Sequence, residues 1–391
     1  MAAAERDVER LTRGAEWHAA RRLVLEHGWN AVAYQILNPG MRLWFSRGGD
    51  AVVGYVTCAG MRVVAGAPVC APDRLRDVAT ELEADAAMHR ERVLFFGAGE
   101  RLERVYAAQR GHCLVPLGAQ PAWDPAAWPD VVRGKASLRA QLNRARNKGV
   151  RVEEWPPGRA RSSATLRGVL AEWLATRGLP PLGFLVTPDL LDVLDDRRVF
   201  VASRAERVVG FLVATPVPAR RGWLVEEWPR TRDAPNGTTH SLIDAAMHAL
   251  ARDGARYVTL GLAPLAERGG ADLRGQPAWL RGAFRWLRAH GRRFYNFRGL
   301  ESFKTSLQPM HWEPVYAIAP AERVTPRMLR AVASAFSGGL PEGMVARAMA
   351  HAAAEELRRV RHALAERAHA LRRTPRATAT PPLPARTPRS R

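Results

Sequence analysis

Apolar runs of strand length, followed by helical patterns, occur twice along this chain in the same order. In the first block, runs at 41–47, 51–60 and 61–69 precede a helical pattern at 73–90 and an apolar run at 93–99. Short apolar runs bounded by Gly, Pro or Asp indicate strands, and a spacing of three to four indicates helices. The tripeptide Gly-Gly-Asp after the first run predicts a hairpin turn.

The second block repeats this order after a Pro- and Trp-rich connector. A basic helix precedes two strands that flank an Ala-Glu turn, a further strand, a helix and a last group of elements. The ranges are 135–149, 198–204, 207–217, 222–229, 239–254, 256–264, 278–291 and 314–320. Strands grouped before helices predict a mixed-sheet α/β (α+β) sandwich in each block. The shared order indicates a structural duplication, although no sequence repeat accompanies it.

Length and composition are those of an ordinary globular protein. The 391 residues suffice for two or three domains, with 47% hydrophobic and 25% charged residues. No apolar run approaches the roughly 18 residues that cross a membrane, and the charged N-terminus does not resemble a secretory signal. Cys58, Cys70 and Cys113 are widely spaced, which argues against disulfides or a zinc site and favours a cytoplasmic location.

Positive charge is the strongest global signal. The net charge is +21, of which residues 357–391 carry +9 and the rest of the chain +12. Such a field attracts nucleic acid, anionic membrane surfaces or polyanionic substrates. The alternative is an arginine-rich composition without a binding role. Residues 371–391 contain too few apolar side chains to fold and are expected to be disordered.

Lysine is rare in this basic chain. Only Lys135, Lys148 and Lys304 are lysines among 59 basic residues. Lysine is a compact point charge, whereas arginine is a planar fork. Lys148 and Lys304 fall in the motifs described below. Their occurrence there favours a specific role for these two lysines over a chance occurrence.

The basic helix combines an apolar stripe with exposed charge. Leu138, Leu142 and Ala145 recur at helical spacing and predict a buried side. The remaining faces carry Arg139, Asn143, Arg144, Arg146 and Lys148. These side chains suit phosphate binding, and the alternative is a solvated helix face.

A turn after an apolar strand is the second candidate site. Asp233, Asn236 and Gly237 are turn residues, and a threonine follows as a helix cap. A helix N-terminus attracts anions, and Arg230 would lie beside it. A plain capped turn explains Asn236 and Gly237 but not Arg230.

Two further stretches complete the candidate motifs. Gly261 ends a strand and permits close approach of a ligand or backbone. The segment 296–309 supplies Arg298, Phe303 and Lys304. The phosphate loops GxxxxGK[ST] and GxGxxG, as well as HExxH, GxSxG and the pyrophosphate run of coenzyme A-dependent acyltransferases, are absent from the sequence. We therefore expect no metal, no cofactor and no coenzyme A.

Taken in order, the stretches LNRARNKG, RTRDAPNG, LGLAPL and FRGLESFKTSLQPMHWEPVYAIAP resemble the C-terminal domain of the phosphatidylglycerol lysyltransferases, the multiple peptide resistance factor family. The resemblance spans roughly residues 14–320. It implies two tandem acyltransferase-like (GNAT-like) lobes. It also implies an aminoacyl-tRNA as donor and co-substrate, and the glycerol hydroxyl of phosphatidylglycerol as acceptor.

The resemblance gives the expected organisation and partners. The parts are a first lobe at 1–118, a connector at 119–134, a second lobe with the active site at 135–320, a helical extension at 321–370 and a disordered basic tail at 371–391. The partners are aminoacyl-tRNA and an anionic phospholipid surface, not DNA, with a cytoplasmic location peripheral to the inner face of the membrane.

The resemblance implies the positions of the motif residues, and we assign their roles as a hypothesis in which the phosphate belongs either to the acceptor head group or to the terminal adenosine. Lys304 and Arg230 are expected to surround a phosphate, and Asp233 to hold the α-ammonium group of the aminoacyl donor. The substrate-binding set is Asn143, Arg144, Lys148, Asn236, Gly237, Gly261, Arg298 and Tyr316. Glu226, Glu227 and His311 are general-base candidates by proximity in sequence only.

Lipid-modifying members of the family usually carry N-terminal membrane-spanning helices, which this sequence lacks. Two alternatives to the lipid transferase therefore stay open. One is a tRNA-dependent aminoacyltransferase that acts on a small molecule or a peptide. The other is a protein that binds tRNA or other polyanions without catalysis.

Overall fold

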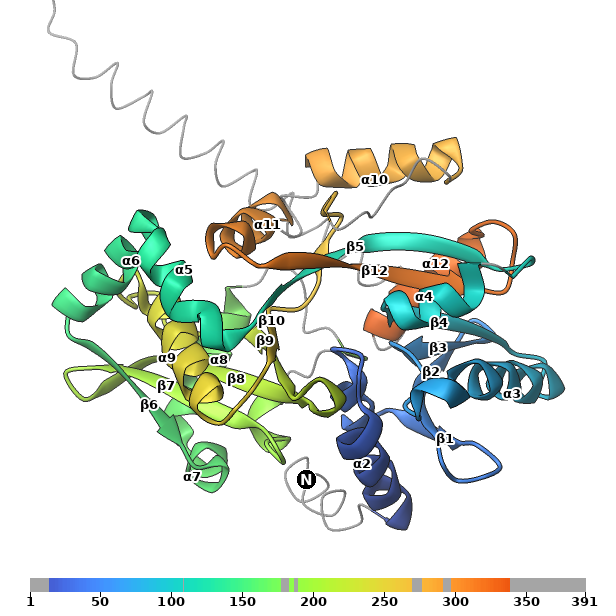
Figure 1. Ribbon diagram of the computed structural model, residues 1–391, viewed down its shortest axis with the longest axis horizontal. Coiled ribbons are helices and arrows are strands. Elements are labelled where there is room, and N and C mark those ends of the chain that lie inside the picture. The colour runs from blue at the N-terminus through green and yellow to red at the C-terminus, as the bar shows by residue number, and fades with distance from the viewer. Residues whose placement is uncertain are drawn as a thin grey trace, which may run out of the picture.

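The computed structural model describes residues 14–107, 109–176, 183–185, 189–268, 276–290 and 297–337. Within these ranges one mixed β-sheet runs through both blocks (Figure 1). The expected helical extension begins with a helix at Pro326–Ser337. The rest of that extension and the basic tail lie outside the described residues.

The strands form a continuous path in the order β1-β2-β3-β4-β12-β5-β10-β9-β8-β7-β6, with β11 paired to β5. Their bounds are β1 Arg42–Phe45, β2 Val52–Cys58, β3 Met61–Ala65, β4 Arg92–Ala98, β5 Cys113–Trp123, β6 Val150–Trp155, β7 Arg198–Arg204, β8 Arg207–Val217, β9 Gly222–Glu227, β10 Tyr257–Thr259, β11 Ala263–Pro264 and β12 His311–Ala319. The mixed α/β class predicted from the sequence is confirmed.

Helices cover the two halves of this sheet (Figure 1). The α-helices are α2 Ala15–His27, α3 Leu75–Met88, α4 Glu100–Ala107, α5 Trp128–Gly134, α6 Ala136–Asn147, α7 Pro157–Ser162, α8 Ala164–Ala175, α9 Thr238–Arg252, α10 Ala278–His290, α11 Phe297–Ser306 and α12 Pro326–Ser337. The 3₁₀ turns are η1 Ala33–Leu37, η2 Pro72–Arg74, η3 Pro125–Ala127, η4 Leu190–Asp192 and η5 Pro218–Arg220. We call α2–α4 with β1–β4 the first lobe, and α5–α9 with β6–β10 the second lobe.

The two hairpins expected from turn residues are present. β1 pairs with β2 in antiparallel register around the Gly-Gly-Asp turn. β7 and β8 pair around Ala205 and Glu206, which both have positive φ, 45° and 66°. Positive φ at both central residues is the geometry that matches the twist of a tight hairpin.

Strands β5 and β12 join the lobes. β12 lies between β4 and β5 and pairs with β5 along its whole length, from His311 opposite Ala122 to Ala319 opposite Cys113. The connector expected at 119–134 thus contains the end of β5, η3 and α5. Prolines disfavour interior strands, so Pro116 and Pro121 made this segment resemble a linker. The strand accommodates Pro116 beside an irregularity in its pairing with β12.

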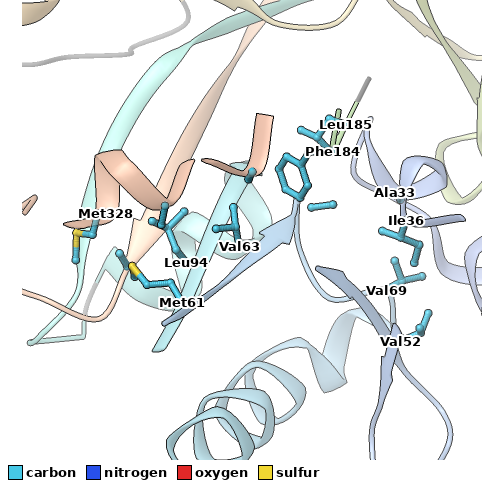
Figure 2. Close-up of a cluster of buried hydrophobic side chains, with 14 of the residues drawn as sticks. Ala33, Ile36, Val52, Met61, Val63, Val69, Leu94, Phe184, Leu185 and Met328 are labelled. Carbon is cyan, nitrogen blue, oxygen red and sulfur yellow. The ribbon is translucent and has the colours of Figure 1, made fainter. Parts of the chain in front are cut away.

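Each lobe buries apolar side chains on both faces of its sheet. In the first lobe, one cluster joins η1, β2, β3 and β4 with α12, including Ile36, Val63 and Met328 (Figure 2). Phe184 and Leu185 enter this same cluster from the second block of the sequence (Figure 2). In the second lobe, α6 and α9 pack against the sheet around two fully buried tryptophans, Trp123 and Trp128. The lobes therefore share core residues as well as a sheet.

A polar contact ties the two lobes at a second place. Arg21 on α2 donates from Nε to Asp196 Oδ2 at 2.6 Å. The Tyr34 hydroxyl donates to the same oxygen at 2.6 Å, and lies 2.8 Å from the carbonyl oxygen of Asp195. Charge-assisted bonds of this kind are about twice as strong as neutral ones, so they help to fix the relative position of the lobes.

Candidate active site at the junction of the lobes

A cavity of about 310 Å³ lies where the first lobe meets β5, β12 and η5. Its walls combine aromatic, cationic and acidic side chains from elements far apart in sequence. Those that the argument uses are Trp29, Arg101, Gln120, Arg220 and Glu313. A concave site with a few convergent polar groups is the usual form of a small-ligand site.

Glu313 is the centre of the polar wall. Arg220 donates from Nη1 to Glu313 Oε2 at 2.9 Å and from Nη2 to Oε1 at 2.5 Å. Gln120 Nε2 and the Tyr257 hydroxyl each donate to Oε2 at 2.9 Å. Both carboxylate oxygens are therefore occupied, and the pair is held in the bidentate geometry that favours arginine.

The ionisation of Glu313 reflects these partners. Burial disfavours the charged form, but the hydrogen bonds and charge of Arg220, with help from Gln120 and His311, outweigh it and lower the pKa of Glu313 to about 2. Burial raises the pKa of Tyr257 above its usual range. Glu313 is thus ionised at neutral pH while the Tyr257 hydroxyl keeps its proton.

Two guanidinium groups flank Trp29 in the same cavity. The Arg101 guanidinium lies 3.2 Å from the Trp29 ring centroid, and that of Arg220 lies 4.9 Å from it. Among the described residues Arg101 has no hydrogen-bond acceptor or carboxylate partner. Burial, and then the charge of Arg220, lower the pKa of Arg101. An anion between the two groups would relieve this repulsion.

Lys304 and Gly261 are in direct contact through a buried hydrogen bond. Lys304 on α11 is 2% exposed, and its Nζ donates to the carbonyl oxygens of Gly261 and Leu262 at 2.8 and 2.9 Å. Gly261 has a φ of +72° and donates its N–H to Thr259 Oγ1 at 3.1 Å. The lysine thus fixes the turn that follows β10.

The basic helix α6 and the start of α9 also lie together. Gly237 has a φ of +96°, and a Cβ there would lie 2.2 Å from the carbonyl oxygen of Gln141 on α6. The side chains predicted to bind substrate on these elements, Asn143, Arg144, Lys148 and Asn236, are exposed. Glycine at this position permits the close approach of α6 to the start of α9.

Arg230 and Asp233 lie on the connection from β9 to α9, and both are exposed. Asp233 Oδ2 accepts from Arg207 Nη1 at 2.8 Å. A hydrogen bond from Thr231, and the charge of Arg207, lower the pKa of Asp233. Asp233 is thus paired with Arg207, whereas Lys304 is bonded to two backbone carbonyls.

The remaining predicted residues occupy separate places. Arg298 is exposed on α11, whereas Tyr316 on β12 packs against the core of the first lobe. Burial, and then Glu103 and Glu100, raise the pKa of Tyr316. Among the general-base candidates, Glu227 is half-buried, and His311 Nε2 lies 3.1 Å from Glu313 Oε1. The side chain of Glu226 lies outside the described part.

Aromatic contacts connect α11 to the start of α9. Phe303, next to Lys304, has its ring centroid 5.7 Å from that of Trp228 and 5.4 Å from that of His240. The Lys304 region and the Asn236–Gly237 turn are therefore neighbours. Arg101, Arg220 and Trp29 belong to no sequence motif and were not predicted as site residues. Glu313 lies within the motif stretch that ends at Pro320 but was not predicted as a site residue either.

Among the described residues, no three or more His, Cys, Asp or Glu side chains are grouped in a way that could hold a metal ion. No described helix is both long and apolar enough to cross a membrane.

The fold defines a two-lobe α/β protein with a charged cavity at the junction of its lobes. The family model for "Phosphatidylglycerol lysyltransferase, C-terminal" matches residues 21–319. The chain belongs to this family, whose name places it among the transferases. A search of curated proteins found no match.

Two solved structures share the fold. One is the C-terminal domain of a protein assigned as a lysylphosphatidylglycerol synthetase from Agrobacterium fabrum, with a TM-score of 0.69 and 23% identity over 83% of this chain and 98% of that one. The other is L-PGS from Bacillus licheniformis, with a TM-score of 0.66 and 22% identity over 85% of this chain and 95% of that one. The shared arrangement therefore extends across both lobes.

The Arg220–Glu313 pair predicts how stability depends on acid. The pKa of Glu313 is about 2 in the folded protein against 4.5 ordinarily. The carboxylate therefore stabilises the fold above pH ~4.5, and this contribution is lost as the pH falls towards ~2. Glu313→Gln should flatten the decline of unfolding free energy in that window by up to about 3 kcal/mol.

Urea unfolding at a series of pH values measures this dependence. Glu153→Gln, an exposed glutamate on β6, is the matched control and should keep the wild-type slope. Parallel curves for wild type and Glu313→Gln would contradict the assignment.

Proposed function

We propose that this protein transfers the aminoacyl group of an aminoacyl-tRNA to a glycerol hydroxyl of phosphatidylglycerol. The observation that supports the acceptor is the pair of guanidinium groups on Trp29, of which Arg101 has no anionic partner among the described residues. A phosphodiester head group would supply the missing charge. Family membership supports the same acceptor class.

The proposed reaction is an exchange of esters. The acceptor oxygen bonds to the carbonyl carbon of the aminoacyl group, the bond from that carbon to the ribose oxygen breaks, and the acceptor proton passes to the ribose. Because the donor ester is already activated, positioning supplies most of the acceleration, on the order of 7–11 kcal/mol in favourable cases. The cavity at the junction of the lobes would position the acceptor.

The donor side of the proposal uses exposed groups of the second lobe. Asn143, Arg144 and Lys148 would contact tRNA phosphates, because α6 presents them to solvent. In the proposal, Arg230 contacts a phosphate of the terminal adenosine. Asp233 holds the α-ammonium group, for which it would exchange its exposed contact with Arg207.

Lys304 has a positioning role in this proposal. Its ammonium group is occupied by two backbone carbonyls, so it would act through the turn at Gly261 and through the placement of α11. Of the remaining proposed contacts, Asn236 and Gly237 lie at the neighbouring start of α9, whereas Tyr316 packs against the core of the first lobe. The enzyme would work in the cytoplasm, at the inner face of the membrane and without a coenzyme.

The direct test mixes purified protein with radiolabelled aminoacyl-tRNAs and phosphatidylglycerol vesicles, and counts label extracted into organic solvent. We expect label in that phase, abolished by prior ribonuclease treatment. Label released from tRNA into the aqueous phase would instead indicate a soluble acceptor. Retention of all label on tRNA would contradict the proposed transfer.

Replacement of Lys304 by arginine tests the positioning role. A guanidinium is larger than an ammonium, and the site is 2% exposed, so the fork cannot satisfy both carbonyls without moving α11. Lys304→Arg should lower transfer at least tenfold with an unchanged far-ultraviolet circular dichroism spectrum. Arg22→Lys, the reverse exchange at an exposed position, should retain activity, and wild-type turnover by Lys304→Arg would refute the role.

A further inference from the structure

A second hollow, wide and open, lies on the other side of α11. It has a volume of about 780 Å³ and is bounded by α10, α11, the residues after β11 and the junction of α5 with α6. Its lining is polar: four cations, two carboxylates and three hydroxyl side chains. The cations are Lys135, Arg268, Arg285 and Arg298. We call it the α11 groove.

Helix α11 has two chemically different faces. Arg298, Ser302 and Thr305 follow one another at spacings of four and three, so they lie on one side of the helix and line the groove. Lys304 is buried on the other side. The bonds from Lys304 to the turn at Gly261 thus fix the helix whose opposite face forms the groove wall.

Positive charge in the groove is only partly neutralised. Arg268 Nε lies 3.2 Å from Glu301 Oε1. Within the described ranges, Lys135, Arg285 and Arg298 have no carboxylate partner. The lining therefore carries a net charge of +2. Ser302 is exposed on the same wall and presents its hydroxyl group to the groove.

The groove continues onto the basic helix. Lys135 is the single residue between α5 and α6. Arg139, one turn further along α6, is exposed and donates to the Val132 carbonyl oxygen at 3.2 Å. Lys135 and Arg139 thus place cations both in the α11 groove and on the exposed side of α6.

We propose that the α11 groove binds the single-stranded 3′ end of the donor tRNA, with Lys135, Arg285 and Arg298 on its phosphates and the hydroxyl groups of α11 on its riboses. This inference rests on the proposed function. An open basic groove with hydroxyl side chains fits a sugar–phosphate backbone. It lacks the apolar wall that lipid acyl chains would require, which argues against a membrane lipid as its occupant. Helix α6 would then hold the adjoining double-stranded part.

The test measures affinity of the full chain for uncharged tRNA across a salt series by fluorescence anisotropy. Lys135→Glu/Arg298→Glu is compared with a matched double charge reversal on the first lobe, Arg22→Glu/Arg92→Glu, whose positions are both exposed. We expect the groove variant to lose roughly tenfold in affinity, and its salt slope to fall by about 1.4, the value for two single-strand phosphate contacts. The matched control should lose less than twofold.

A second measurement locates the contact. Removal of the single-stranded 3′ nucleotides from the tRNA should weaken wild-type binding but leave binding of the groove variant nearly unchanged, because the same contact is then already lost. Equal losses in wild type and variant would overturn the inference while leaving tRNA binding intact. A wild-type protein that binds no tRNA would instead overturn the proposed function. Loss of binding to phosphatidylglycerol vesicles, with tRNA affinity unchanged, would assign the groove to lipid.

Discussion

The half-buried ion pair between Arg220 and Glu313 is the interaction on which the junction of the lobes depends. Glu313 belongs to β12, the strand inserted between β4 and β5, while Arg220 belongs to η5 of the second lobe. Removal of one partner leaves the other charge uncompensated, which is destabilising in proportion to the burial of the pair. The pair therefore fixes β12 relative to the second lobe and also places Arg220 against Trp29.

Three consequences follow from this arrangement. The sheet is continuous, so the lobes cannot shift without breaking strand pairing. The cavity takes its residues from both lobes and from β12, so it exists only in the assembled fold. Finally, α11, which precedes β12 in the chain, lies between the turn at Gly261 and the α11 groove. The proposed acceptor site and the proposed tRNA surface are thus connected through elements adjacent in sequence.

The sequence contained enough information for the strands and helices but not for the site. Periodicity and turn residues predicted the hairpins at Gly48–Asp50 and Ala205–Glu206, and both are present. Prolines in the second half of β5 led to the prediction of a linker there. The segment is a strand because its pairing with β12 overrides local propensity. Lys304 and Gly261 were found through motifs and do contact each other. Arg101 and Arg220 were not predicted as site residues because only the tertiary structure brings both of them against Trp29.

The central claim is that the acceptor binds in the cavity at the junction of the lobes. The most direct measurement is transfer by Ala67→Trp, since Ala67 is half-buried and lines that cavity. Ala87→Trp, on the exposed side of α3, provides the control for the added indole. A filled cavity should lower transfer to phosphatidylglycerol by more than about a hundredfold, with tRNA affinity and melting temperature unchanged. Wild-type transfer by the folded Ala67→Trp protein would contradict the account.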